Sequence, residues 1–155
     1  LAISGADFLE RIGFTGIPMF LAFMLLTSTV NVLMGSASAK WSIFAPIFVP
    51  MFMLMGYHPS AIQQAYRIGD SCTNAITPLS VYLYMMLDIC ETKYEMKGLN
   101  VGKMLSGLWP MSLCVLIIWY SFFVLWTMLG IPYGLGGQLY LSAEQCAQLG
   151  ITPLG

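Results

Sequence analysis

Arg67 and Asp70 are the residues of this chain best suited to chemistry, because they place two opposite charges inside a largely apolar sequence. Charged residues within membrane segments are energetically expensive and commonly mark the pathway of a substrate or an ion. The two share a face if the segment is helical, so a purely structural ion pair is one interpretation. The other is functional: Arg67 binds a substrate carboxylate through paired hydrogen bonds, and Asp70 holds a cation or a proton.

Small polar residues follow this pair and end at Pro78. Their hydroxyl and amide oxygens, together with carbonyl oxygens freed before the proline, are ligands of the kind that bind sodium where a transporter helix unwinds. Serine, threonine and proline also simply kink membrane helices, and that interpretation stays open. The candidate ion ligands beside Asp70 are Ser71, Thr73, Asn74 and Thr77.

A second polar interruption, at 35–41, separates two apolar runs. Asn31 and Ser38 offer oxygen ligands there, although small residues at such a place also allow close helix packing. Lys40 is expected either to neutralise an anionic ligand or to extend to water. Trp41 is expected either to stack on an aromatic substrate or to anchor at a membrane interface. With Arg67, these are the candidate substrate-binding residues.

The composition places both interruptions in a membrane protein. The chain is 58% hydrophobic and 8% charged, whereas an ordinary soluble domain is roughly a quarter charged. A net charge of −1 without a basic patch argues against a nucleic-acid partner. The one histidine and the four separated cysteines provide no catalytic or transition-metal spacing. We therefore expect an all-α, multi-pass membrane protein that is not an enzyme and has no cofactor.

The alternation of apolar and polar runs predicts the elements that position the candidate residues. Residues 1–15 are expected to form an interfacial helix. Residues 16–56 are expected to form a re-entrant hairpin with its tip at 35–41, although two complete spans joined by a short loop are the alternative. Residues 57–90 are expected to form one span that is unwound at 70–78, where exposed peptide groups would make an ion or anion site.

The remaining segments set the expected topology. Residues 91–103 are expected to form a polar loop, which contains the only cluster of lysines in the sequence. The positive-inside rule therefore places this loop in the cytoplasm. Residues 104–129 are the clearest transmembrane helix, and the tail 130–155, without lysine or arginine, is expected outside. The hairpin and the broken helix would then both open to the outside.

The length of the chain suits one repeat of a transporter built from paired repeats. The chain begins at Leu1 without the features of a signal peptide. We therefore expect the C-terminal part of a larger protein, in the form of one half of an inverted-repeat transporter.

Three ordered segments resemble the p-aminobenzoyl-glutamate transporter (AbgT) family: 35–41 (GSASAKW), 45–57 (APIFVPMFMLMGY) and 65–78 (AYRIGDSCTNAITP). Their ordered spacing is far more specific than any single motif. The resemblance implies the second hairpin, the second broken helix and the last span of a homodimeric bacterial inner-membrane protein. The N-terminal half of the same transporter would then be a partner of this chain.

The resemblance also implies a function. Members of the family move p-aminobenzoyl-glutamate, an anionic aromatic product of folate breakdown, with Na⁺ or H⁺ as the coupling ion, and an acid from the first repeat completes their site. The family's functional positions correspond to Asn31, Ser38, Trp41, Pro59, Arg67, Asp70 and Pro78, with Pro59 and Pro78 at the helix breaks.

Two other functions remain open from the sequence. The first is a proton-driven antiporter that exports sulfonamide antimetabolites, with Asp70 as the proton relay. A sulfonamide shares the aminophenyl ring of the first substrate but lacks its dicarboxylate. The second is a structural membrane subunit without transport, in which the polar motif only locks helices together.

Overall fold

Helices make up the regular structure of the computed structural model, which describes residues 2–11, 13–96, 98–134 and 136–150. The all-α fold expected from the sequence is confirmed for these residues. The elements, in chain order, are α1 (Ala2–Arg11), α2 (Ile17–Leu33), α3 (Ala37–Leu54), α4 (Pro59–Cys72), the 3-10 helix η1 (Asn74–Ile76), α5 (Val81–Tyr94), α6 (Val101–Met128) and α7 (Ala143–Leu149).

Two of the described helices are long and apolar enough to cross a membrane, α3 with 18 residues and α6 with 28. At about 1.5 Å per residue, α6 is roughly 42 Å long and α3 roughly 27 Å. The hydrocarbon core of a bilayer is about 30 Å thick, so α6 exceeds it and α3 nearly matches it. Helix α2 is also apolar but has only 17 residues.

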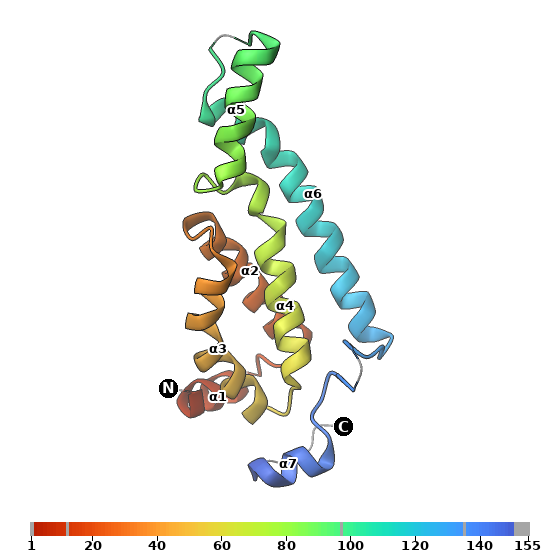
Figure 1. Ribbon diagram of the computed structural model, residues 1–155. Coiled ribbons are helices and arrows are strands. Elements are labelled where there is room, and N and C mark those ends of the chain that lie inside the picture. The colour runs from red at the N-terminus through yellow and green to blue at the C-terminus, as the bar shows by residue number, and fades with distance from the viewer. Residues whose placement is uncertain (1, 12, 97, 135, 151–155) are drawn as a thin grey trace.

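Helices α2 and α3 make a hairpin within the range 16–56, but its tip is shorter than expected. Only residues 34–36 join the two helices. Ser36 caps α3 by accepting a hydrogen bond from the backbone N–H of Ala39, so most of the segment 35–41 is helical. Figure 1 shows this tip beside the place where α4 gives way to α5.

The helix break lies further along the chain than the expected range 70–78. Helix α4 continues to Cys72, η1 follows, and α5 begins at Val81. Asp70 is therefore in the last turn of α4 and not in unwound chain. Thr77 is extended, with ψ of 114°, which is the backbone conformation that the following proline favours.

The segments after the break also differ from the expected ranges. Helix α5 continues to Tyr94, so the connection to α6 is shorter than the expected loop 91–103. Asn100 caps α6, because its Oδ1 accepts a 2.9 Å hydrogen bond from the N–H of Lys103. The tail contains the unexpected helix α7, which begins with a capping box formed by Ser142 and Gln145.

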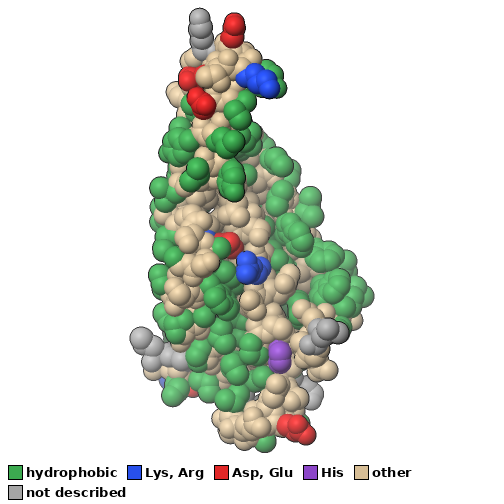
Figure 2. All heavy atoms as spheres, in the orientation of Figure 1, with side chains coloured by type: hydrophobic (Ala, Val, Ile, Leu, Met, Phe, Trp, Pro, Cys, Tyr) green, Lys and Arg blue, Asp and Glu red, His purple; other side chains and the backbone are tan. Residues whose placement is uncertain are grey.

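The hydrophobic core lies between the hairpin, α4 and one face of α6. Phe20 of α2 is at its centre, with ring centroids 5.6 Å from Phe52 and 5.7 Å from Phe123. Outside this core, much of α5 and α6 exposes large apolar side chains. Figure 2 shows these apolar groups along the length of the molecule, with several charged groups at the end where α5 meets α6 and others near the middle and at the opposite end.

Candidate functional site

Asp70 forms an ion pair with Lys40 and not with Arg67. The Lys40 ammonium contacts Asp70 Oδ1, and the two side chains are only 1% and 8% exposed. A spacing of three residues leaves about 60° between two side chains on a helix. That angle is enough to bury Asp70 against the hairpin while Arg67 stays exposed. The structural ion pair considered for Arg67 and Asp70 is therefore wrong.

Asn31, in the last turn of α2, joins this ion pair to the helix break. Its Oδ1 accepts a hydrogen bond from the Lys40 ammonium. Its Nδ2 lies 2.7 Å from the carbonyl oxygen of Asp70, 3.0 Å from Thr73 Oγ1 and 2.8 Å from Asn74 Oδ1. One buried amide thus connects α2, α3, α4 and the start of η1.

The hydroxyl groups proposed as ion ligands are engaged with the backbone. Thr73 donates to the carbonyl of Ser28 at 3.0 Å. Thr77 donates to the carbonyls of Asn31 and Thr73 at 3.2 and 2.9 Å. Ser71 is exposed and donates to the carbonyl of Arg67 at 2.7 Å.

These contacts decide whether the site fits a free metal cation. The donor atoms are oxygens of the right kind, but the Asp70 carboxylate already contacts the Lys40 ammonium. The hydroxyls of Thr73 and Thr77 donate to carbonyls and do not converge with that carboxylate on one point. In this arrangement the residues present do not fit a bound Na⁺.

Arg67 lies at a separate cavity of about 180 Å³ between the start of α3 and the middle of α4. Trp41 packs there against Tyr66, with ring centroids 4.7 Å apart. The Tyr66 hydroxyl donates a 2.6 Å hydrogen bond to the carbonyl of Ala37, which holds the hairpin against α4. The lining residues are Ala37, Ser38, Trp41, Ser42, Gln63, Tyr66 and Arg67.

The structure therefore divides the predicted substrate-binding residues into two groups. Arg67, Trp41 and Ser38 come together at the cavity, whereas Asn31 and Lys40 are buried at the ion pair. Lys40 neither reaches water nor lines the cavity, so both expectations for it are replaced by its contact with Asp70. Sequence reasoning missed the other lining residues, which are Ala37 and Ser42 of α3 and Gln63 and Tyr66 of α4. Gln63 lies three residues before Tyr66 and four before Arg67, and this spacing was a usable signal, because such residues are neighbours on a helix.

Pro59 and Pro78 lie at helix boundaries. Pro59 is the first residue of α4, where the missing N–H of proline costs no hydrogen bond. His58 precedes it and caps the helix, since its Nδ1 accepts a hydrogen bond from the N–H of Ser60 at 3.2 Å. Pro78 lies between η1 and α5 and keeps the chain from continuing as one helix.

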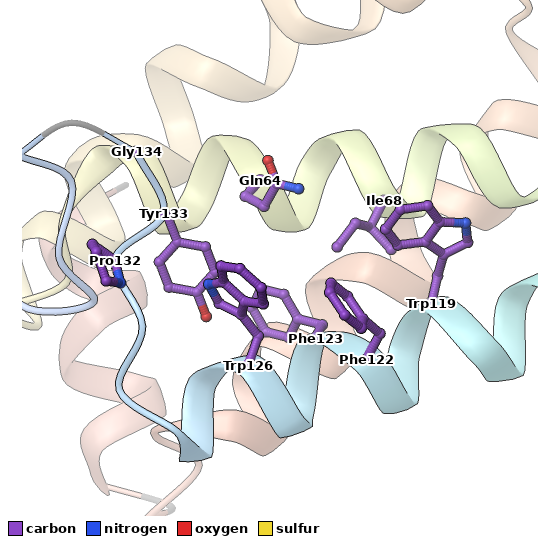
Figure 3. A pocket seen from close by; sticks show the side chains of 9 residues that line it. All are labelled: Gln64, Ile68, Trp119, Phe122, Phe123, Trp126, Pro132, Tyr133 and Gly134. Carbon is purple, nitrogen blue, oxygen red and sulfur yellow. The ribbon is translucent and has the colours of Figure 1, made fainter.

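A larger cavity of about 470 Å³ lies away from these groups, between α4, α6 and the segment 132–134. Figure 3 shows aromatic side chains of α6, among them Trp119 and Trp126, facing Gln64 and Ile68 of α4. None of its lining residues is charged. This cavity therefore lacks a partner for a substrate carboxylate, and we place the candidate site at Arg67.

Two solved structures have a similar fold. The Alcanivorax borkumensis YdaH transporter aligns with a TM-score of 0.81 and 40% identity, over 86% of this chain and 28% of that one. Neisseria gonorrhoeae MtrF, described as illuminating a class of antimetabolite efflux pumps, aligns with a TM-score of 0.71 and 44% identity, over 81% of this chain and 24% of that one.

Sequence comparison points the same way. The chain is 38% identical over 136 residues to the p-aminobenzoyl-glutamate transport protein of Escherichia coli (strain K12). The aligned region covers 88% of this chain and 26% of that protein. The chain thus spans about a quarter of the length of that relative. The family model described as "AbgT putative transporter family" matches residues 1–141. The chain belongs to the AbgT family of transporters.

Proposed function

We propose that the full-length protein is a secondary transporter that moves p-aminobenzoyl-glutamate across the bacterial inner membrane. The observation that carries this proposal is the cavity where an exposed guanidinium, Arg67, lies beside an indole, Trp41. The substrate has a glutamate dicarboxylate that suits the guanidinium and a ring that suits the indole. The Escherichia coli relative, named for the transport of this compound, supports the same substrate.

In this proposal each residue of the cavity has one task. Arg67 has no carboxylate partner among the described residues, so its charge is available for the substrate. Trp41 is half-buried against Tyr66 and offers its ring at a fixed angle. Ser38 adds a hydroxyl group from the same turn of α3. The N-terminal half of the transporter would close the site with an acid of its own, and the full-length protein would act as a homodimer.

A transporter that accumulates its substrate needs a coupling ion, for which we propose Na⁺ or H⁺. Asp70 is the candidate residue for that ion because it is a buried carboxylate next to the helix break. Unpaired carboxylates at membrane depth are costly. Asp70 is paired with Lys40 in this structure, and it is therefore expected to take up a cation or a proton whenever that pair separates during transport.

The experiment is uptake of labelled p-aminobenzoyl-glutamate into proteoliposomes that contain the full-length protein. A sodium gradient is imposed first and a proton gradient second, and flux driven by one of them supports the proposal and identifies the ion. Arg67→Ala should abolish uptake while leaving membrane insertion intact, because it removes the carboxylate partner. Arg11→Ala, which removes an exposed arginine at the end of α1, is the matched control. Normal uptake by Arg67→Ala would contradict the role of Arg67.

A second candidate function is export of sulfonamide antimetabolites in exchange for protons. The likeness to MtrF favours it, since that protein is described with antimetabolite efflux pumps. The absence of p-aminobenzoyl-glutamate flux under either gradient would support it, and Asp70 would then be tested as a proton relay. A non-transporting structural subunit fits less well, because an exposed Arg67 at an open cavity does not lock helices together.

A further inference from the structure

The cation next to Asp70 belongs to the protein itself. Lys40 is the fourth residue of α3, and its ammonium contacts Asp70 of α4. Its ammonium is also bonded to Asn31 Oδ1. The two oxygens, one from a carboxylate and one from an amide, are the kinds of atom that a hard metal cation selects.

Two cations cannot share this carboxylate at low cost. The Lys40 and Asp70 side chains are almost completely buried, and like charges repel strongly where water is scarce. No other acidic side chain contacts the pair among the described residues. A metal ion at Asp70 and an ammonium at Asp70 are therefore mutually exclusive occupants.

We propose that Lys40 is the resident cation of Asp70, and that a free cation binds Asp70 only after the Lys40 ammonium has moved away. Lys40 is thus the residue that determines the cation affinity of the site. The coupling role of this exchange rests on the proposed transport function. The carboxylate carries a compensating charge in both states, so the exchange never leaves it bare at membrane depth.

The position of Lys40 ties the exchange to the hairpin. Lys40 lies close to the connection 34–36, whereas Asp70 lies on α4. Movement of the start of α3 away from α4 withdraws the ammonium and opens Asp70 to a cation from solution, while Asn31 stays beside Asp70 because it lies on α2. Binding of that cation then opposes the return of α3, because both positive charges compete for Asp70 and Asn31.

The test is the thermal melting of the purified full-length transporter in sodium chloride against choline chloride at equal ionic strength. Lys40→Met removes the resident charge and keeps an apolar chain of similar length. We expect the apparent sodium affinity, from the dependence of Tm on sodium, to rise at least about tenfold in this variant. The double variant Lys40→Met/Asp70→Asn should lose the response to sodium. Lys103→Met, which removes an exposed lysine at the start of α6, should behave as the wild type.

Two results would overturn the proposal: no increased sodium response in Lys40→Met, or an increased response that persists in the double variant. If Lys40→Met cannot be recovered in choline chloride, recovery in sodium chloride alone supports the proposal. Failure in both salts, with recovery of the double variant, overturns it. The melting assay contains no substrate, so it tests cation binding at Asp70 independently of transport. A negative melting result would not change the interpretation of the flux experiment, and a negative flux result would not change the interpretation of the melting experiment.

Discussion

At the scale of single residues, the ion pair between Lys40 and Asp70 is the strongest constraint on the site. Burying two charges is costly, and the cost is recovered only when the remaining polar atoms find partners. Asn31 supplies such a partner to the ammonium through Oδ1 and bonds the Asp70 carbonyl through Nδ2. No buried side-chain nitrogen or oxygen lacks a partner in the part of the chain that the structure describes.

This arrangement predicts that Asp70→Asn destabilises the full-length transporter by about 3–5 kcal/mol, because it leaves the Lys40 ammonium buried without a counter-charge. Thermal melting of the purified protein measures the loss. Asp7→Asn, at an exposed acid of α1, is the matched control and should change little. A loss below about 1 kcal/mol, the size typical of a surface pair, would show that the ion pair is not buried in the full-length protein.

The sequence indicated the right residues but not their pairing. Arg67 and Asp70 stand out because charges are rare in this chain, and a local rule joins residues three apart on a helix. The actual partner of Asp70 is 30 positions away on another helix. That contact depends on how the hairpin packs against α4, and a pattern of neighbouring residues in the sequence cannot predict this packing.

At the scale of elements, the docking of α2 on α4 holds the site together. Gly69 makes this approach possible: a Cβ atom there would lie 1.9 Å from Thr27 Oγ1 and 2.6 Å from the carbonyl oxygen of Met24. Ser28 of the same helix donates a 2.8 Å hydrogen bond to the carbonyl of Gly69. The close approach places Asn31, one turn further along α2, against Asp70.

We therefore expect Gly69→Ala to force α2 and α4 apart and to destabilise the protein by about 1–3 kcal/mol, as overpacked cores do. Melting temperature and the yield of monodisperse protein measure the effect. Gly107→Ala is the control, since its Cβ would meet nothing within 4 Å on α6. Equal behaviour of the two variants would contradict the close packing of α2 on α4.

The helices themselves were largely predictable. Apolar runs interrupted by polar residues indicated the hairpin, the broken helix and the last long helix. The helix boundaries were less predictable. The cap at Ser36 starts α3 inside the expected tip, and a hydrogen bond from Asn31 of α2 to the Asp70 carbonyl supports the last turn of α4. The spacing of Ser142 and Gln145 did carry a capping-box signal for α7, which the sequence reasoning overlooked.

At the scale of the whole molecule, the described helices leave large apolar surfaces on α5 and α6 (Figure 2). In α6, Ser112 and Phe123 are the buried residues, and most of the helix is exposed. Such a surface suits contact with lipid or with other helices of a membrane protein. The exposed apolar surface agrees with the length of this chain, which spans about a quarter of its Escherichia coli relative. In our proposal the chain acts together with the N-terminal half of the full-length transporter.

In the proposed transporter, Arg67 recognises a carboxylate of the substrate while Trp41 recognises its ring. The most direct test is equilibrium binding of p-aminobenzoyl-glutamate and of a sulfonamide to the full-length protein and to its Arg67→Gln variant. We expect the variant to bind p-aminobenzoyl-glutamate roughly 10- to 100-fold more weakly, because charge-assisted hydrogen bonds contribute about 1.5–3 kcal/mol. Sulfonamide binding should stay nearly unchanged, since that ligand lacks the dicarboxylate. Equal losses for both ligands, or no loss for either, would contradict the proposed role of Arg67.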